Sequence, residues 1–285
     1  MKFDRVIRAF SANEEYIGIA VDATETLKAA IASRGYGKEV PIKLGEILME
    51  AGMMASMLKG DDDELTICLD SFDHATRFIA TANKKIEIKA YSSSINDNVF
   101  KGPATLTVIK DLGLKVPYNS TTLASLDDFG GSMEDYFRQS EQIDTHSKLL
   151  VSFDEDNNLI RASGIFLQVL PFCDPKIKAE MEDNWDNYPS LNSLFYSSAS
   201  LEEMIQILFK EGSVKTEELP IKWHCSCSKE RSEAMIESLP TKEIEAMIED
   251  NKTIYIECSF CGKSYSFTVD ELKSILARKD ASNKA

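Results

Sequence analysis

The spacing of apolar side chains along the first 170 residues predicts a body of mixed strands and helices. Apolar residues recur every 3.6 positions across Ile42–Leu58, which predicts a long helix, and the alanine-rich run Thr24–Ser33 predicts a shorter one. Short runs of β-branched and other apolar residues predict strands at Val6–Phe10, Tyr16–Val21, Leu65–Leu69, Thr76–Ala80, Ile86–Tyr91, Ala104–Lys110, Leu149–Phe153 and Ile165–Leu170. This order of elements indicates an α+β fold rather than a regular parallel sheet.

The segment that follows this body is acidic but still contains large apolar residues. Pro171–Pro175 marks a boundary, and Asp174–Pro220 carries 10 acidic and 4 basic residues. Ser200 and Glu203 predict a capping box, and Gly212 can end the helix. This helix would carry an apolar stripe of Leu201, Met204, Ile205 and Leu208. The stripe fits a surface helix packed on the body, and it equally fits a marginal linker that unpacks on a signal.

We therefore expect three parts: an α+β body at 1–173, a helical linker at 174–220, and a small cysteine-containing domain at 221–285. The last part is predicted to contain helices at Glu230–Ser238 and Thr241–Ile248 and strands at Thr253–Glu257 and Tyr265–Val269. Such a short domain builds only a small apolar core, so a bound metal would have a structural role in it.

Composition and charge exclude several classes of protein. Hydrophobic residues make up 43% of the 285 positions, which excludes wholesale disorder. The longest apolar run, Ile47–Leu58, is too short for a membrane span and is interrupted by Glu50. The N-terminus Met1–Arg5 lacks the apolar core of a signal peptide, so we expect a cytoplasmic protein. A net charge of −15 disfavours binding to nucleic acid, which requires clustered Lys and Arg.

Four of the six cysteines form two close pairs near the C-terminus. Cys225 and Cys227 are separated by one residue, and Cys258 and Cys261 follow after a spacer of thirty residues. Zinc prefers four soft ligands in a tetrahedron, with each sulfur about 2.3 Å from the metal. Gly262, directly after the second pair, permits a tight turn of the backbone around the sulfurs. The sequence therefore predicts one zinc ion bound by these four cysteines.

The same residues allow other assignments, which fit the sequence less well. Cys258 and Cys261 alone resemble a thioredoxin-like redox pair, but a glycine and a strand follow them where such a motif normally opens a helix. His224 is a further candidate ligand, although a neighbouring histidine more often lies outside a complete set of four thiolates. The single-residue spacing of Cys225 and Cys227 is tighter than in most structural zinc sites, which suggests a site that releases its metal on oxidation.

Several motifs together resemble one known family. The specific ones are Cys225–Arg231, which reads Cys-Ser-Cys-Ser-Lys-Glu-Arg, and Cys258-Ser-Phe-Cys261. Further matches occur at Leu44–Glu46, Thr107–Gly113, Pro117-Tyr118, Tyr136-Phe137 and Gly164–Pro171. On these residues the chain resembles the heat-shock protein 33 family, which are redox-regulated, ATP-independent chaperones of the bacterial cytosol. The resemblance extends over nearly the whole chain.

The resemblance implies a protein that is inactive while reduced and zinc-bound. Oxidation would pair Cys225 with Cys227 and Cys258 with Cys261, release zinc, and unfold both the C-terminal domain and the linker. The apolar surface so exposed would hold unfolding proteins, usually in a homodimer. No enzymatic turnover is expected, because the sequence shows no Ser–His–Asp or metal-hydrolase pattern and has three histidines, His74, His146 and His224.

The body departs from the family pattern at several positions. Asp70–Asp73, Lys89–Tyr91 and Asn119–Thr121 stand where the family has glycine-containing segments, and Phe172-Cys173 stands where it tends to have small residues. These changes bear on client range and chaperone strength rather than on metal binding. Of the two remaining cysteines, Cys68 is expected to be a buried, inert thiol, and Cys173 is expected to be exposed at a loop, with no assigned role.

Two functions of other classes compete with the switch. One is a constitutive zinc-ribbon interaction module, which would keep its metal in peroxide. The other is a disulfide oxidoreductase that uses Cys258 and Cys261 and would keep its turnover without zinc and without Cys225. Replacing Cys225 and Cys227 with serine distinguishes the three functions.

Overall fold

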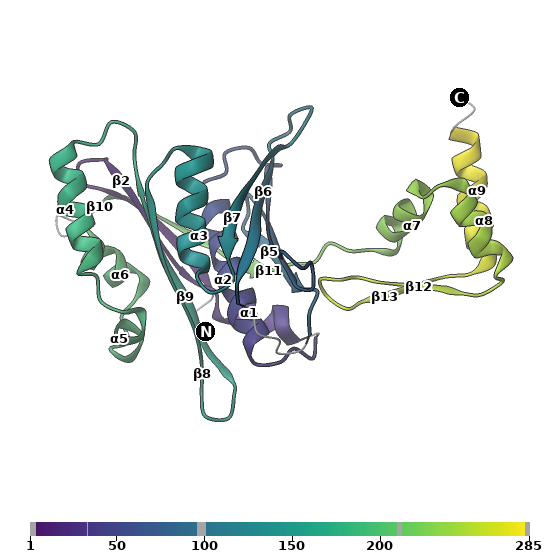
Figure 1. Cartoon of the computed structure of the whole chain (residues 1–285), viewed down its shortest axis with the longest axis horizontal. Coiled ribbons are helices and arrows are strands. Elements are labelled where there is room, and N and C mark those ends of the chain that lie inside the picture. The colour runs from purple at the N-terminus through teal and green to yellow at the C-terminus, as the bar shows by residue number, and fades with distance from the viewer. Residues whose placement is uncertain (1–3, 33, 96–100, 210–212, 283–285) are drawn as a thin grey trace. The chain divides into compact units, whose positions relative to one another are not determined.

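The computed structural model describes residues 4–32, 34–95, 101–209 and 213–282. The chain forms two compact units, Met1–His224 and Cys225–Ala285. The larger unit contains two β-sheets with helices between and outside them, which confirms the predicted α+β fold (Figure 1). Ser33 and Gly212, which were predicted to end helices, lie outside the described residues.

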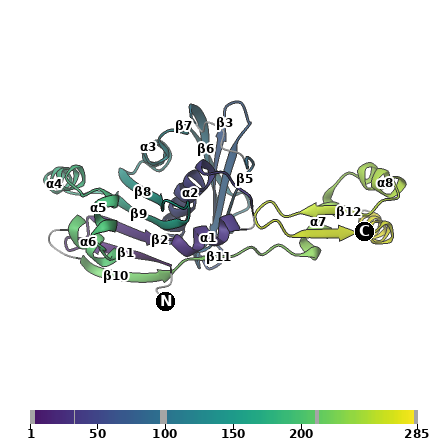
Figure 2. The same cartoon turned by 90° about the horizontal axis from the view of Figure 1, so that it is seen from below.

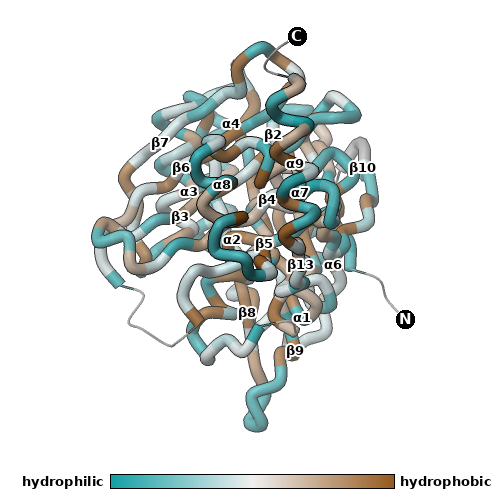
Figure 3. The backbone as a smooth tube through the Cα atoms, turned by 90° about the vertical axis from the view of Figure 1, so that its right-hand side faces the viewer, coloured by the Kyte–Doolittle hydropathy of each residue, from teal (hydrophilic) through white to brown (hydrophobic). Residues whose placement is uncertain are grey.

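The first sheet has five antiparallel strands in the order β10-β1-β2-β9-β8. The strands are β1 (Arg5–Ser11), β2 (Tyr16–Asp22), β8 (Thr145–Phe153), β9 (Leu159–Val169) and β10 (Ser213–Pro220). Successive side chains of a strand point to opposite faces, so Val6 and Ile7 lie in two different apolar clusters. Both faces of this sheet are therefore covered. The polar turn that joins β8 to β9 forms a hydrophilic tip (Figure 3).

The second sheet has six strands in the order β11-β5-β4-β3-β6-β7. Its strands are β3 (Glu64–Ser71), β4 (Arg77–Asn83), β5 (Glu87–Ser92), β6 (Pro103–Asp111), β7 (Tyr118–Ser125) and β11 (Lys222–Trp223). The pair β11–β5 is parallel, and the other pairs are antiparallel. Short β11 follows β10 directly, so the end of the larger unit touches both sheets.

Helix α2 (Glu39–Ala55) lies between the two sheets and contacts strands of both (Figure 2). It begins three residues earlier than the predicted helix, and its central turns are almost entirely buried. The neighbouring helices are α1 (Thr24–Ala32), α3 (Phe129–Tyr136) and the π-helical turn η1 (Phe137–Glu141). Strand β7 and helix α3 had not been predicted, because β7 is mostly polar and α3 contains Gly130-Gly131.

Three helices cover the outer face of the five-stranded sheet: α4 (Pro175–Asp186), α5 (Leu191–Tyr196) and α6 (Leu201–Leu208). The predicted capping box is present at α6, where the Ser200 hydroxyl accepts from the Glu203 amide and the Glu203 carboxylate accepts from the Ser200 amide. The chain then returns to the sheet as β10. The residues predicted as a linker thus consist of three helices and an edge strand.

The C-terminal unit contains α7 (Lys229–Ser238), α8 (Thr241–Glu249), β12 (Ile254–Glu257), β13 (Ser264–Phe267) and α9 (Val269–Ser282). Strands β12 and β13 form an antiparallel hairpin. The buried core consists of Ile236, Ile244, Tyr265, Phe267, Leu272 and Ile275. Val269 begins α9 rather than ending a strand, because the Thr268 hydroxyl accepts from the Glu271 amide and the Glu271 carboxylate accepts from the Thr268 amide. Among all described residues, no helix is long and apolar enough to cross a membrane.

Glu50 on α2 is a carboxyl group buried completely within the larger unit. Its Oε1 accepts a hydrogen bond from the Ser147 hydroxyl, and its Oε2 has no hydrogen-bond partner in the described structure. Burial raises the pKa of Glu50 to about 7; the hydrogen bond from Ser147 opposes this shift, and the nearby Glu134 and Glu46 add to it. The core therefore favours the protonated carboxyl.

Glu50→Gln should make the stability of the larger unit less dependent on pH. Between the ordinary pKa of 4.5 and the folded value of about 7, the folded chain binds more protons, so its free energy of unfolding falls as pH rises through this window. Relative to the parent, the variant should gain at most about 3 kcal/mol at pH 8 and under about 1 kcal/mol at pH 5. Urea denaturation at the two pH values measures this difference.

The matched control is Glu25→Gln on α1, where the carboxylate is exposed and pairs with Lys28. It should change stability little at either pH. An equal gain from Glu50→Gln at pH 5 and pH 8 would contradict the assigned titration.

Candidate metal centre

Two short segments of the C-terminal unit bring the four paired cysteines together. Cys225 and Cys227 precede α7, whereas Cys258 and Cys261 lie in the turn between β12 and β13. The four sulfur atoms all lie within 4.8 Å of one another. The Sγ atoms of Cys225 and Cys258 are 3.6 Å apart, and those of Cys227 and Cys261 are 3.4 Å apart. Each segment therefore supplies two sulfurs to one cluster.

Local backbone geometry explains how the second pair turns. The Gly262 amide donates to the Cys258 carbonyl at 2.8 Å, and the Cys258 amide donates to the Lys263 carbonyl at 2.9 Å. This turn requires a φ of 71° at Gly262, in the left-handed region that glycine adopts without a steric cost. The glycine identified in the sequence thus closes the turn.

The first pair is held by the start of α7. The Ser228 side chain caps this helix by accepting from the Arg231 amide at 3.2 Å, and the Arg231 guanidinium donates to the Ser226 hydroxyl. These bonds fix the chain on both sides of Cys227. They give a structural role to Ser228 and Arg231, which follow the cysteine pair in the sequence.

The thiols of Cys225 and Cys227 differ in pKa before any metal binds. Burial raises the pKa of Cys225 to about 12. Burial also acts to raise the pKa of Cys227, but hydrogen bonds from Tyr265 and from the other thiols outweigh it and bring the pKa to about 7. The Tyr265 hydroxyl donates to the Cys227 sulfur at 3.2 Å. Tyr265 had been predicted only as part of an aromatic strand, because its hydrogen bond depends on the folded hairpin.

The cluster matches the ligand set of a zinc site. In a tetrahedron with zinc–sulfur bonds of about 2.3 Å, neighbouring sulfurs are about 3.8 Å apart. The separations in the structure fall around this value. Among the residues that the structure describes, no carboxylate or imidazole joins the four half-buried thiols, and thiolates are donors that zinc prefers. His224 is exposed and does not belong to the cluster. Its backbone amide donates to the Ile88 carbonyl.

The two other cysteines differ from their expected settings. Cys68 on β3 is half-buried rather than buried, because its side chain points away from α2 on the outer face of the six-stranded sheet. Burial still raises the pKa of this thiol. Cys173 is also half-buried, and its sulfur lies 3.2 Å from a carboxylate oxygen of Glu15 and 3.5 Å from the hydroxyl of Tyr16. Neither contributes to the cluster.

Comparison with known proteins agrees with the cysteine pattern. The family model described as Hsp33 protein matches residues 4–268. This chain belongs to the Hsp33 family. The 33 kDa chaperonin of Lachnoclostridium phytofermentans is 32% identical over 293 residues, which cover 97% of this chain and 99% of that relative. The 33 kDa chaperonin of Shouchella clausii is also 32% identical, with coverage of 98% and 99%. The resemblance predicted from the sequence is thereby confirmed.

A solved Hsp33 structure shows that the fold is shared. The crystal structure of the 33 kDa chaperonin from Thermotoga maritima has a TM-score of 0.87 to this chain, with 22% sequence identity, and the match covers 98% of this chain and 100% of the other. Membership of the Hsp33 family makes this protein a member of a chaperone family, and such proteins bind unfolded clients. The four-cysteine cluster is compatible with the zinc site of that family.

Proposed function

We propose that this Hsp33 family member is an ATP-independent holdase of the cytoplasm that is switched on by oxidation. The parts would be a client-binding body at 1–173, a linker at 174–220 and a switch at 221–285. The observation that carries the proposal is the cluster of Cys225, Cys227, Cys258 and Cys261, which gathers four sulfurs within 4.8 Å. These four residues would hold one zinc ion while reduced. The clients would be unfolded proteins, held without catalytic turnover and by a homodimer.

Zinc, when bound, would keep all four sulfurs as thiolates and cross-link the start of the small unit to its β12–β13 turn. A thiolate attacks hydrogen peroxide to form a sulfenic acid and hydroxide, and a second thiolate then displaces another hydroxide to form a disulfide. Two such reactions, pairing Cys225 with Cys227 and Cys258 with Cys261, transfer four electrons to two peroxide molecules. The resulting disulfides no longer offer thiolate ligands, so the unit loses the cross-link that supports its small core.

The linker helices supply the surface that such a switch would expose. One apolar cluster joins the outer face of the five-stranded sheet to α4, α5 and α6. The sheet contributes Ile7, Ala9, Tyr16, Ala20, Ile165, Leu167 and Val169. The linker contributes Met181, Trp185, Tyr188, Leu191, Leu194, Leu201, Met204, Ile205, Leu208 and Phe209. Separation of these helices from the sheet would uncover a broad apolar surface, which binds unfolded chains by the hydrophobic effect.

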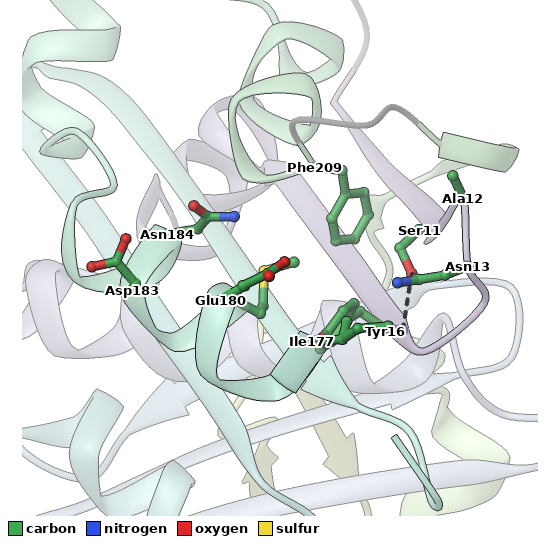
Figure 4. A pocket seen from close by; sticks show the side chains of 10 residues that line it. Ser11, Ala12, Asn13, Tyr16, Ile177, Glu180, Asp183, Asn184 and Phe209 are labelled. Atoms are coloured by element: carbon green, nitrogen blue, oxygen red, sulfur yellow. Dashed lines mark hydrogen bonds between the residues drawn. The ribbon is translucent and has the colours of Figure 1, made fainter. Parts of the chain in front are cut away.

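The contact between linker and body is incomplete along one edge. A cleft of about 320 Å³ lies between α4 and the β1–β2 turn (Figure 4). Tyr16, Ile177, Met181 and Phe209 form its apolar lining, and Glu180, Asp183, Asn13, Asn184, Ala12 and Ser11 complete it. Water can therefore reach the edge of the apolar cluster. Segments with such partial packing open locally at lower free energy than a fully sealed core.

The decisive experiment measures aggregation of a heat-unfolded client by light scattering, together with zinc release. The full-length protein is added either reduced and zinc-loaded or after peroxide treatment at heat-shock temperature. Suppression only after oxidation, with about one zinc released per chain, would support the proposal. Retained zinc would indicate a constitutive zinc module instead. Catalytic disulfide exchange that persists without zinc would indicate an oxidoreductase.

Tyr265→Phe tests the support of the metal site without removing a ligand. The substitution removes the hydroxyl that contacts Cys227 but keeps the buried ring. Loss of such a supporting hydrogen bond typically weakens metal affinity by about 10–100-fold. We therefore expect the dissociation constant for zinc, measured by competition with a chelator, to rise at least about tenfold. Tyr255→Phe on β12 is the control, because Tyr255 is 71% exposed. Equal zinc affinity in both variants would contradict this role.

A further inference from the structure

Strand β8 presents two polar residues to the linker helices. His146 and Lys148 are two positions apart, so their side chains point to the same face of the five-stranded sheet. This is the face that α4, α5 and α6 cover, and the next residue on it, Leu150, packs against their apolar cluster. Ser147 points to the opposite face, where its hydroxyl contacts Glu50. A cation and an imidazole thus lie at the edge of an otherwise apolar contact.

Lys148 contacts the end of α4 through both its charge and its donors. Its Nζ donates to the Trp185 carbonyl at 2.9 Å and to the Tyr188 carbonyl at 3.5 Å. The same Nζ lies 4.7 Å from the ring centroid of Trp185 and 5.3 Å from that of Tyr188. The C-terminal carbonyls of a helix form the negative end of its dipole and favour a cation. Lys148 therefore makes two contacts with Trp185 in the last turn of α4 and two with Tyr188, which follows the helix.

His146 covers the same tryptophan from the body. Its ring stacks on Trp185 with a centroid distance of 5.4 Å, and Trp185 in turn stacks on Tyr188 at 5.8 Å. His146 Nδ1 lies 3.7 Å from a carboxylate oxygen of Glu134 on α3, and the other oxygen of Glu134 accepts from the Ser147 amide at 3.0 Å. Contacts with the body thus fix the ring that packs on Trp185.

The charges around Lys148 suit a partly desolvated cation. Burial lowers the pKa of Lys148, and Asp186 and Glu134 act in the opposite direction. Both aromatic partners are 6% exposed, so water does not screen these contacts fully. Cation–π contacts and hydrogen bonds to a charged donor are strongest under such conditions.

We propose that Lys148 and His146 form a clamp on β8 that positions the α4–α5 segment of the linker over the apolar face of the body. Opening of this clamp would then expose that face by a step distinct from loss of the metal cross-link. The inference rests on the proposed function, in which the linker covers the client-binding surface. Lys148 is a positioning residue in this scheme, since it contacts the linker and not a client.

The test compares hydrogen exchange in the full-length, reduced and zinc-loaded protein. Lys148→Met keeps an unbranched apolar stem but removes the charge and the donors. We expect amides of Pro175–Tyr196 to exchange at least about tenfold faster, which corresponds to about 1.4 kcal/mol. Lys148→Arg, which keeps the cation, should restore much of the protection. Lys178→Met is the matched control, because Lys178 on α4 forms an exposed ion pair with Asp144, the residue before β8. This substitution should change hydrogen exchange less than about threefold.

A second variant and a second measurement keep the clamp testable if Lys148→Met does not fold. His146→Ala removes only the stacked ring and should accelerate exchange in the same segment. In a Trp223→Phe background, Trp185 is the only tryptophan, and Lys148→Met should shift its emission to longer wavelength. Unchanged exchange in both variants, or faster exchange spread equally over α1, α2 and α3, would overturn the clamp.

The outcome for the clamp is distinguishable from the outcome for the proposed function. Faster exchange in α4–α5 supports the clamp whatever the chaperone assay shows. If the same reduced variant also suppresses client aggregation, the linker is a cover for the client surface. If α4–α5 is released but suppression is not gained, the clamp stands and the covering role of the linker is refuted.

Discussion

A chain carrying Cys225→Ser and Cys227→Ser should retain no zinc and should have an unfolded C-terminal unit. The substitutions leave two of the four sulfurs, and metal binding in small zinc domains supplies about 10–16 kcal/mol of folding free energy. The apolar core of this unit consists of six buried side chains, which cannot replace that contribution. Zinc analysis and hydrogen exchange across α7–α9 measure the effect. Under the proposed function, the variant should also suppress client aggregation without an oxidant.

The matched control replaces the two cysteines outside the cluster, Cys68 and Cys173, with serine. This variant should keep its zinc and its folded C-terminal unit, because neither sulfur lies in the cluster. Retention of zinc and of the folded unit by the Cys225→Ser, Cys227→Ser chain would refute the assigned ligand set. Retention of disulfide-exchange turnover by that chain would favour an oxidoreductase.

Leu208→Ala should loosen the linker while the cysteines remain reduced. Leu208 on α6 is completely buried in the cluster that joins the linker helices to the five-stranded sheet. Truncating such a leucine costs about 3–5 kcal/mol when the surrounding atoms cannot close the cavity. We expect faster hydrogen exchange in α6 and stronger suppression of client aggregation in the reduced, zinc-loaded state. Zinc content should not change, because α6 lies outside the unit that holds the cysteines.

Ile207→Ala is the control for this prediction, since Ile207 is the preceding residue of the same helix and is 38% exposed. Like Leu208→Ala, this substitution replaces an aliphatic residue of α6 with alanine and so alters helix propensity. It removes few buried atoms, so it should leave no large cavity. Comparable exchange in the two variants would show that Leu208 does not anchor α6. Faster exchange in Leu208→Ala without any gain in reduced-state activity would argue against a restraining linker.

The cysteine cluster was predictable because its information is local. Two short ligand spacings and the following Gly262 define the turn and the donor set, and the structure brings all four sulfurs together. The capping box of α6 was predictable for the same reason, since Ser200 and Glu203 lie within one helical turn. Strand β7 was missed because Tyr118–Ser125 alternates weakly in polarity and is held by pairing with β6. Tertiary pairing overrides propensity in such segments.

Contacts between distant residues could not be predicted from pattern alone. Nothing in the local sequence connects Lys148 to Trp185 or Glu50 to Ser147, because these pairs form only when α4 packs on the sheet or α2 packs against β8. Cys68 illustrates the same limit. Its strand is apolar enough to suggest burial, yet the side of the sheet it faces is set by which face α2 covers. Alternation of side chains along a strand defines two faces of the sheet but does not show which face is buried.

The pairing of β10 with β1 means that the linker is anchored at both ends. Strand β9 ends at Val169, before the linker helices, and β10 begins at Ser213, after them. Both strands belong to the same sheet, in which β1 and β2 lie between them. While β10 remains paired, melting of α4–α6 therefore creates a closed loop rather than a dangling arm. The entropic cost of closing such a loop grows only with the logarithm of its length. Recapture of the helices is consequently a unimolecular event whose rate does not depend on protein concentration.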